Sequence, residues 1–367
     1  MKLFSKGLVA AALSLSILIA GCSSAAPESS SQPPQQSSSV SVSQEQPKSV
    51  TDMAGRTIEL PDNIEKAYCS NPVSTLMVYT FAPEKLLGWN YKFNDAEKKY
   101  ILPEYLDLPV FGMNDAVNLE AIVAAKPQIC FVAGGVEKAD IENAEKLQSQ
   151  LGVPVIMLDG ALTKTAEVYK LIGEVFGMQD RANDLAGYAS DILNKVASTV
   201  IPENERVTVY YGNGVDSLDT SPRNSTAAET VEMLGAINVA DVESKKGSRI
   251  KVSAEQIIGW NPQVIFVNGE AKENITGGTA AQQLMSNPTF STVTAVKDKK
   301  VYGIPKEPFS WLDRPVSANR LLGLKWAGNL LYPKYYDFDM NQEIKDFYKL
   351  FYHMEITDEQ VETLING

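Results

Sequence analysis

Two segments of the chain, 135 residues apart, repeat one sequence pattern. Residues 118–132 read NLEAIVAAKPQICFV and residues 253–267 read SAEQIIGWNPQVIFV, with six aligned positions identical. In each copy a side chain suited to cap a helix precedes about two helical turns, a proline ends the helix, and an apolar run predicts a buried strand. Ser253 and Gln256 also have the spacing of a capping box. Two such units imply two lobes of similar construction.

Strand-like runs elsewhere in the chain alternate with helical patterns. They lie at residues 67–69, 155–158, 207–211 and 301–304, and helical patterns follow most of them. This alternation predicts parallel sheets. We therefore expect an α/β fold with two Rossmann-like lobes and mainly parallel sheets.

One amphipathic helix is predicted between the lobes. Apolar residues recur at spacings of three and four between Asp180 and Thr199. At ~1.5 Å per residue this segment spans about 30 Å, enough to run from one lobe to the other. We expect an N-terminal lobe over residues 50–178, one long linker helix over 179–200 and a C-terminal lobe over 201–367.

The N-terminus has the pattern of a secretory signal. Lys2 and Lys6 precede an apolar run from Leu8 to Ala20 that is too short to span a bilayer. The run ends in LIAGC, which resembles the bacterial lipobox and implies cleavage before Cys22 and a lipid on its sulfur. Residues 1–21 are then a lipoprotein signal peptide. An ordinary signal peptide cut nearby is the alternative.

Residues 22–49 consist mostly of Ser, Gln, Pro and Ala, with few apolar side chains. Such a composition does not bury enough surface to offset the entropy of folding, so it predicts a disordered tether. Its reach is on the order of 30 Å. We expect a monomeric protein outside the cytoplasm, held to the membrane by lipid on Cys22, on a Gram-positive surface or in a periplasm.

Charge and cysteine content narrow the function classes. The formal charge is −12, and removal of Lys2 and Lys6 with residues 1–21 makes it −14. Nucleic-acid binding is not expected, because it needs clustered Lys and Arg. Cys69 and Cys130 each lie in an apolar segment, which favours buried free thiols. A disulfide between them is the alternative, and only their separation in space decides.

Catalysis and bare-metal binding have little support in the sequence. His353 is the single histidine. A Ser/His/Asp triad therefore has one candidate base and no G-x-S-x-G motif to accompany it. No multi-histidine site for a bare metal ion can be built. We expect a protein that is not an enzyme and carries neither a cofactor nor a metal of its own.

Aromatic side chains in two loops are candidate walls of a binding cleft. Trp89 and Tyr91 follow a glycine in the first lobe, and Phe309 and Trp311 lie in a proline-bearing loop of the second. Such side chains are hard to bury completely in loops, so they suit a flat or chelated ligand. Packing of these loops onto their own lobe is the alternative reading.

Arginines are scarce in the folded body and gather in the second lobe. They are Arg223, Arg249, Arg314 and Arg320. Because guanidinium groups pair with anionic oxygens, the group favours an anionic ligand. Ordinary surface ion pairs account for any one of them equally well.

From about Val50 to Gly367 the chain resembles the iron-chelate, haem and cobalamin class of periplasmic binding proteins. The resemblance rests on DMAGR at 52–56, on NLE at 118–120 and SAE at 253–255 before proline-terminated helices, and on WLDRP at 311–315 leading into GLKW at 323–326. It implies two lobes on one rigid helix. It also implies capture of a metal chelate and delivery to an ABC permease dimer driven by a cytoplasmic ATPase.

Phe309, Trp311 and Arg314, with Trp89 and Tyr91 opposite, are expected to line one cleft between the lobes, because their loops lie at matching ends of the two α/β units, where open sheets bind ligands. Arg223 and Arg249 are further ligand candidates. We expect a ferric siderophore, with haem or a corrinoid as the alternative within this class and an enzyme or sensor domain as the alternative outside it. Tyr210 and Tyr211 are the tyrosines that suit haem.

Glu120 and Glu255 occupy the same place in both copies of the repeat, and the resemblance assigns them to docking on permease arginines. Stabilisation of the helix dipole is their simpler role.

Overall fold

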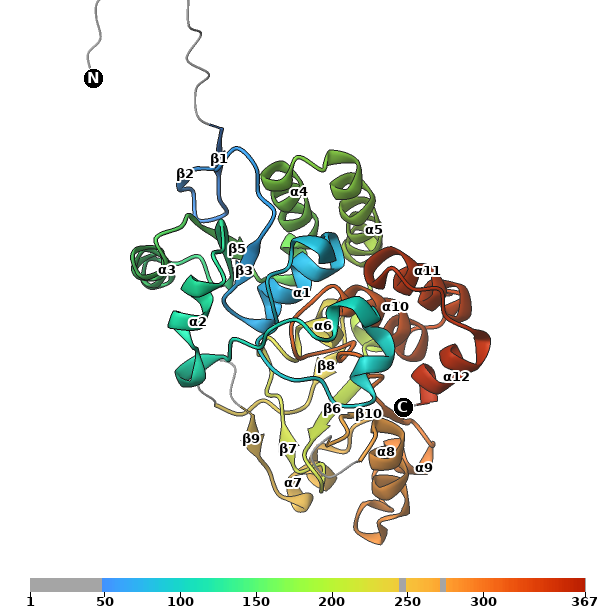
Figure 1. Cartoon of the computed structure of the whole chain (residues 1–367). Coiled ribbons are helices and arrows are strands. Elements are labelled where there is room, and N and C mark those ends of the chain that lie inside the picture. Colours follow the sequence, from blue (N-terminus) through green and yellow to red (C-terminus); the bar gives the residue numbers. More distant parts are fainter. Residues whose placement is uncertain (1–47, 244–248, 271–274, 367) are drawn as a thin grey trace, which may run out of the picture. The chain divides into compact units, whose positions relative to one another are not determined.

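The computed structural model describes residues 48–243, 249–270 and 275–366 (Figure 1). The described residues belong to one compact unit, Gln46–Gly367. The predicted signal peptide, Cys22 and residues 22–47 of the predicted tether lie outside the described residues. No helix in the described ranges is long and apolar enough to cross a membrane.

The N-terminal lobe is built on a parallel sheet with the order β3-β4-β5. Its strands are β3 (Ala67–Cys69), β4 (Ile129–Gly134) and β5 (Val155–Asp159), preceded by the antiparallel pair β1 (Ser49–Thr51) and β2 (Thr57–Glu59). Its helices are α1 (Pro72–Phe81), α2 (Leu119–Ala124), α3 (Lys138–Leu151) and α4 (Thr165–Phe176). The predicted alternation of strand and helix is confirmed here.

Successive residues of the N-terminal strands enter two different hydrophobic clusters, so helices cover both faces of the sheet (Figure 1). In the parallel register Tyr68 pairs with Cys130, and Cys69 pairs with Phe131. Paired residues share a face and successive residues alternate, so the two cysteine side chains point to opposite faces. Both are buried and free. The structure therefore supports the prediction of buried free thiols and not the alternative of a disulfide.

The C-terminal lobe has a second sheet with the order β11-β10-β6-β7-β9, and β8 also pairs with β6. Its strands are β6 (Thr208–Asn213), β7 (Asp219–Thr220), β8 (Ile237–Asn238), β9 (Ile250–Lys251), β10 (Val264–Val267) and β11 (Val301–Gly303). Its helices are α6 (Glu229–Met233), α7 (Ala254–Trp260), α8 (Gly277–Ser286), α9 (Thr294–Lys297), α10 (Asn319–Leu331), α11 (Met340–Tyr352) and α12 (Asp358–Asn366). The pairs of β6 with β8 and β10, and of β10 with β11, are parallel, whereas β7 pairs with β6 and β9 in antiparallel fashion.

Both copies of the repeat fold as the sequence predicts. Asn118 caps α2 with its side chain, and Ser253 forms a capping box with Gln256 at the start of α7. Before the proline of each copy, Lys126 and Asn261 adopt positive φ values of 56° and 45°. In each copy the chain therefore leaves the helix through a residue of positive φ at the equivalent position and then enters the central strand, β4 or β10. The repeat is thus a repeat of structure.

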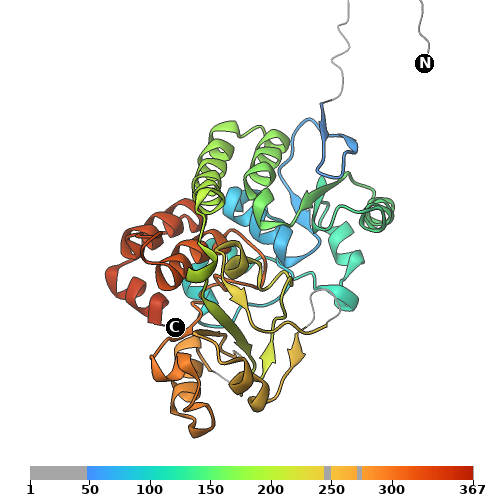
Figure 2. The same cartoon turned by 180° about the vertical axis from the view of Figure 1, so that it is seen from behind.

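The predicted linker helix is present as α5 (Gln179–Ser198), one residue displaced from the predicted 180–199. It packs against α4 of the N-terminal lobe and α10 of the C-terminal lobe (Figure 2). Its apolar stripe, including Leu185, Ala189 and Ile192, is buried. The stripe therefore faces helices of both lobes.

Helix α11 returns from the C-terminal part of the chain to the N-terminal lobe, where it contacts α1. The rings of Tyr79 and Tyr352 have centroids 6.2 Å apart, and those of Tyr100 and Tyr348 are 5.4 Å apart. Arg181 on α5 donates to the carbonyl oxygen of Leu350. The lobes are therefore joined by helix packing as well as by the chain itself.

Candidate functional site

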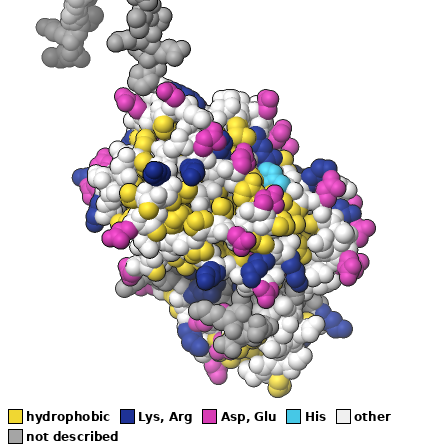
Figure 3. All heavy atoms as spheres, viewed as in Figure 1, with side chains coloured by type: hydrophobic (Ala, Val, Ile, Leu, Met, Phe, Trp, Pro, Cys, Tyr) yellow, Lys and Arg dark blue, Asp and Glu magenta, His cyan; other side chains and the backbone are white. Residues whose placement is uncertain are grey.

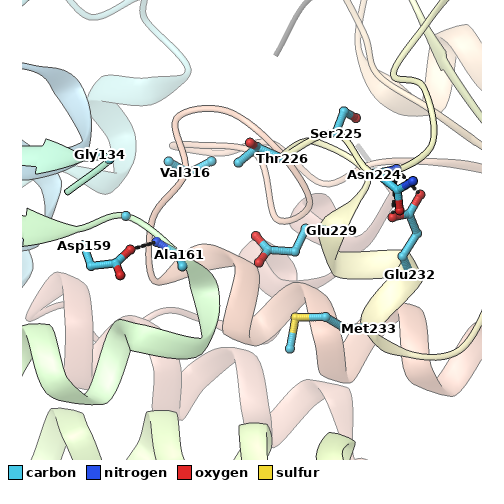
Figure 4. Close-up of a pocket in the computed structure, with 12 residues that line it drawn as sticks. Gly134, Asp159, Ala161, Asn224, Ser225, Thr226, Glu229, Glu232, Met233 and Val316 are labelled. Atoms are coloured by element: carbon cyan, nitrogen blue, oxygen red, sulfur yellow. Dashed lines mark hydrogen bonds between the residues drawn. The ribbon is translucent and has the colours of Figure 1, made fainter. Parts of the chain in front are cut away.

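A cavity of about 680 Å³ lies between the lobes (Figure 4). Its lining residues are Gly134, Gly135, Asp159, Gly160 and Ala161 from the N-terminal lobe and Asn224, Ser225, Thr226, Glu229, Glu232, Met233 and Val316 from the C-terminal lobe. The first group lies at the carboxyl ends of β4 and β5, the edge where open α/β sheets bind ligands. The volume falls within the range of about 300–1,000 Å³ that small-molecule sites occupy.

The N-terminal wall of the cavity is formed largely by backbone. The amide of Gly160 donates to the carbonyl oxygen of Gly134 at 2.8 Å, which ties the ends of β5 and β4 together. A Cβ atom on Gly160 would lie 3.2 Å from the Cα atom of Gly134, closer than side chains normally approach. Asp159 is the charged residue of this wall, and its Oδ1 accepts a hydrogen bond from the amide of Ala161 at 2.9 Å. Glycine here keeps the two strand ends close.

The C-terminal wall is formed by side chains that a buried arginine holds in place. Arg320 of α10 has 1% of its surface exposed. Its Nη1 donates to Oε2 of Glu229 at 2.6 Å and to the carbonyl oxygen of Thr226 at 3.3 Å. Burial lowers the pKa of Arg320, and the neighbouring Glu229 opposes this shift. One buried guanidinium thus fixes two groups of the cavity wall.

Glu232 is the third carboxylate of the cavity. Its two carboxylate oxygens accept from the amide of Asn224 at 3.1 and 3.2 Å. Burial raises the pKa of Glu232, and the hydrogen bond from Asn224 and the charge of Arg223 oppose the shift. The twelve lining residues contain three carboxylates and no Lys or Arg. The wall is therefore acidic.

The arginines predicted to favour an anionic ligand pair instead with the protein's own carboxylates. Arg223 binds Asp241 at 2.7 Å, Arg249 lies 3.4 Å from Asp313, and Arg320 binds Glu229. Arg314 is exposed. None of the four belongs to the residues that line the cavity. Intramolecular ion pairs, the alternative reading, account for three of them.

The aromatic loops of the two lobes pack on one another. The rings of Phe93 and Phe309 have centroids 6.1 Å apart, and Tyr91 packs against Phe93 at 5.8 Å. Trp89 is buried and donates from Nε1 to the carbonyl oxygen of Tyr105. The space lined by these rings is about 10 Å³. The expectation of an open aromatic cleft at Trp89, Tyr91 and Phe309 is corrected, because the rings fill it.

Trp311 and Tyr211 are core residues, with no surface exposed. Trp311 packs on Trp326 of α10 with ring centroids 6.4 Å apart. The hydroxyl of Tyr211 accepts from Nδ2 of Asn268, and burial raises the pKa of this tyrosine. Their predicted place on a ligand-facing wall is corrected, since both side chains point to the layer between the second sheet and α10. Tyr210, the other tyrosine suited to haem, is equally buried.

A family model described as periplasmic binding protein matches residues 82–308, more than half of the chain. The chain belongs to the periplasmic binding protein family. It is therefore an extracytoplasmic solute-binding protein, and the two lobes with a cavity between them are the frame of that family. The coarser part of the predicted resemblance is confirmed.

Individual relatives within the periplasmic binding protein family cover most of the chain. The molybdate-binding protein MolA of Haemophilus influenzae is 26% identical over 344 residues, 86% of this chain and 93% of MolA. YvrC of Bacillus subtilis, named an uncharacterized ABC transporter substrate-binding lipoprotein, is 22% identical over 81% of this chain and 89% of its own length. The solved structure of an ABC transporter solute binding protein from Sulfurospirillum deleyianum has a TM-score of 0.77 and 30% identity, covering 87% of this chain and 99% of that one.

The two repeat glutamates of this periplasmic binding protein are both exposed. Glu120 lies in the first turn of α2 and Glu255 in the first turn of α7. Hydrogen bonds from its own backbone amide and from Ser253 lower the pKa of Glu255. Their equivalent positions on the two lobes suit either docking or helix capping.

A second cavity of about 490 Å³ lies between the N-terminal loop 94–97 and residues of the C-terminal lobe that include Lys306 and Glu307. Oε2 of Glu307 is buried and has no hydrogen-bond partner among the described residues. Burial raises the pKa of both Glu97 and Glu307, and the charge of Glu307 adds to the shift at Glu97. Here too, carboxylates from both lobes face one space.

Sequence reasoning missed the residues that line the larger cavity. Its N-terminal wall had a recognisable signal, because Gly134 and Asp159 are the last residues of the buried strands β4 and β5. Its C-terminal wall had none, since Glu229 and Arg320 are 91 residues apart and only the packing of α6 on α10 joins them. His353, the single histidine, is an exposed residue at the end of α11 (Figure 3). In the described residues no group of three or more His, Cys, Asp or Glu side chains could hold a metal ion.

Proposed function

We propose that this protein is the substrate-binding lipoprotein of an ABC importer, that a metal chelate binds in the 680 Å³ cavity, and that a ferric siderophore is the first candidate. The observation that carries the proposal is a cavity lined by both lobes in a member of this family. The protein then passes its solute to a permease dimer driven by a cytoplasmic ATPase. Lipid on Cys22 would keep it at the membrane, and the role needs no catalytic step.

The size and chemistry of the cavity support an organic chelate over a bare cation. A chelated metal brings its own ligands, so the protein needs to recognise only the outer surface of the complex. Acceptor oxygens of Asp159, Glu229 and Glu232, together with the apolar Met233 and Val316, suit such a surface. Haem and corrinoid are less well supported, because Tyr210 and Tyr211 are buried away from the cavity.

Molybdate is the second candidate, because the H. influenzae relative is named for binding it. A bare oxyanion needs positively charged groups or a set of N–H donors. The lining residues of this cavity instead include three carboxylates and no Lys or Arg. We therefore place the chelate before molybdate.

Ligand retained through purification tests the proposal most directly. Mass spectrometry of the released small molecule is expected to find a metal chelate, and ferric siderophores are expected to quench tryptophan fluorescence in a saturable way. Saturable binding of molybdate, with no response to any ferric chelate, would reject the chelate assignment.

The docking role of Glu120 and Glu255 is a further part of the proposal. Equivalent positions on two lobes suit two equivalent permease subunits, and exposed interface charges govern association more than folding. Replacing both with Ala should abolish uptake and leave ligand affinity intact. The matched control replaces Glu145 of α3 and Glu362 of α12, two other exposed glutamates, and should transport normally. Normal uptake by the Glu120/Glu255 variant would leave only the helix-capping role.

A further inference from the structure

We propose that the cavity selects chelates with a positively charged group, and that this group bridges Asp159 of one lobe and Glu229 of the other. The inference rests on the proposed function and names the charge of its ligand. Figure 4 shows the two carboxylates pointing toward each other from opposite walls. An ammonium or a similar cationic group between them would contact both lobes at once.

Each of the two carboxylates has one oxygen fixed by the protein and one left for a ligand. Oδ1 of Asp159 accepts from the amide of Ala161, and Oε2 of Glu229 accepts from Arg320. Within the described part of the chain, Oδ2 of Asp159 and Oε1 of Glu229 accept no hydrogen bond. These anchored side chains lose little conformational freedom on binding, so they are preorganised acceptors.

The balance of charge around the cavity favours a cation. Arg320 offsets the charge of Glu229. Lys164 interacts electrostatically with Asp159 but forms its ion pair with Glu167, and none of the described residues that line the cavity is Lys or Arg. Glu232 adds a third carboxylate to the same wall. A positive ligand relieves the mutual repulsion of these groups, whereas an anionic ligand would add to it.

A chelate series that differs in one charge tests the inference. The probes are a linear ferric trihydroxamate with a terminal ammonium, its N-acetylated neutral form and its N-succinylated anionic form. Titrated into the mature protein with fluorescence detection, the cationic form is expected to bind about tenfold more tightly than the neutral form, and the anionic form more weakly still. High salt should narrow the difference.

Asp159→Asn is the matching variant, because its Oδ1 still accepts from Ala161. It should remove most of the preference for the cationic chelate, measured as the ratio of the affinities for the cationic and neutral forms. Asp107→Asn, at an exposed aspartate of the same lobe, is the control and should keep the preference. Equal binding of all three chelates, tighter binding of the anionic one, or an unchanged preference in Asp159→Asn would overturn the inference while leaving capture of chelates intact. Saturable binding of molybdate alone would reject both the inference and the proposed function.

Discussion

The two walls of the cavity come from lobes of similar construction, yet they differ in how they are made. The N-terminal wall is mostly glycine backbone at the ends of β4 and β5, with Asp159 as its charged group. The C-terminal wall consists of side chains on and before α6, held from behind by the buried Arg320. One lobe therefore mainly sets the shape of the cavity, and the other mainly sets its charge.

Substitution of a carboxylate should cost far more stability in the C-terminal wall than in the N-terminal wall. Glu229→Gln leaves the charge of Arg320 buried without its partner, so the free energy of unfolding should fall by about 2–3 kcal/mol. Asp159→Asn keeps its hydrogen bond to Ala161 and should change stability by less than about 0.5 kcal/mol. Urea denaturation of both variants measures the difference. Equal losses of unfolding free energy in the two variants would show that Arg320 does not need Glu229 to offset its buried charge.

The equivalent glutamines of the two copies of the repeat, Gln128 and Gln263, should contribute differently to stability. Oε1 of Gln128 accepts from the amides of Glu65 and Lys66, and its side-chain amide donates to the carbonyl oxygen of Asn63. The side chain of Gln263 accepts two hydrogen bonds, both from Thr208, and this residue is exposed. Gln128→Ala should therefore lower the free energy of unfolding by about 1–2 kcal/mol, and Gln263→Ala by about 0.5 kcal/mol. A larger loss at Gln263 would contradict the assigned pairing.

A smaller effect concerns the shape of the N-terminal wall. Gly160→Ala places a methyl group against the backbone of Gly134, so it should destabilise by about 1 kcal/mol and weaken ligand binding. The control is Gly187→Ala on α5, where a Cβ atom meets nothing within 4 Å and helix propensity favours alanine. That variant should be neutral or slightly more stable in thermal denaturation. A Gly160→Ala variant that is more stable than the wild type would show that the backbone at Gly134 moves easily to accommodate the methyl group.

The smallest effect lies at the second cavity, where each lobe contributes a glutamate. Because burial raises the pKa of Glu307, its ionised form disfavours the folded state at neutral pH. Glu307→Gln should raise the melting temperature by roughly 1–2 °C at neutral pH. The gain should shrink as the pH falls through the raised pKa, since the wild-type carboxyl then becomes protonated. Glu362→Gln, at an exposed residue, should show no such pH dependence.

Much of the fold could be predicted because its signals are local. The caps at Asn118 and Ser253, the proline stops and the stripe of α5 each depend on residues a few positions apart. The cavity could not be predicted in the same way. Whether Trp311 faces solvent depends on α10, and whether Arg249 is available for a ligand depends on Asp313, 64 residues away. Sequence patterns identified aromatic and cationic residue types but not their distant partners.

The return of α11 to the N-terminal lobe has a consequence for biogenesis. The core around α1 includes rings from both ends of the folded body, since Tyr79 packs on Tyr352 across 273 positions of the chain. A chain that emerges N-terminus first cannot complete this core until its last helices have appeared. Contacts of such high sequence separation form late and slowly. During export the leading half of the polypeptide therefore lacks part of its final packing, which keeps it pliable while it crosses the membrane.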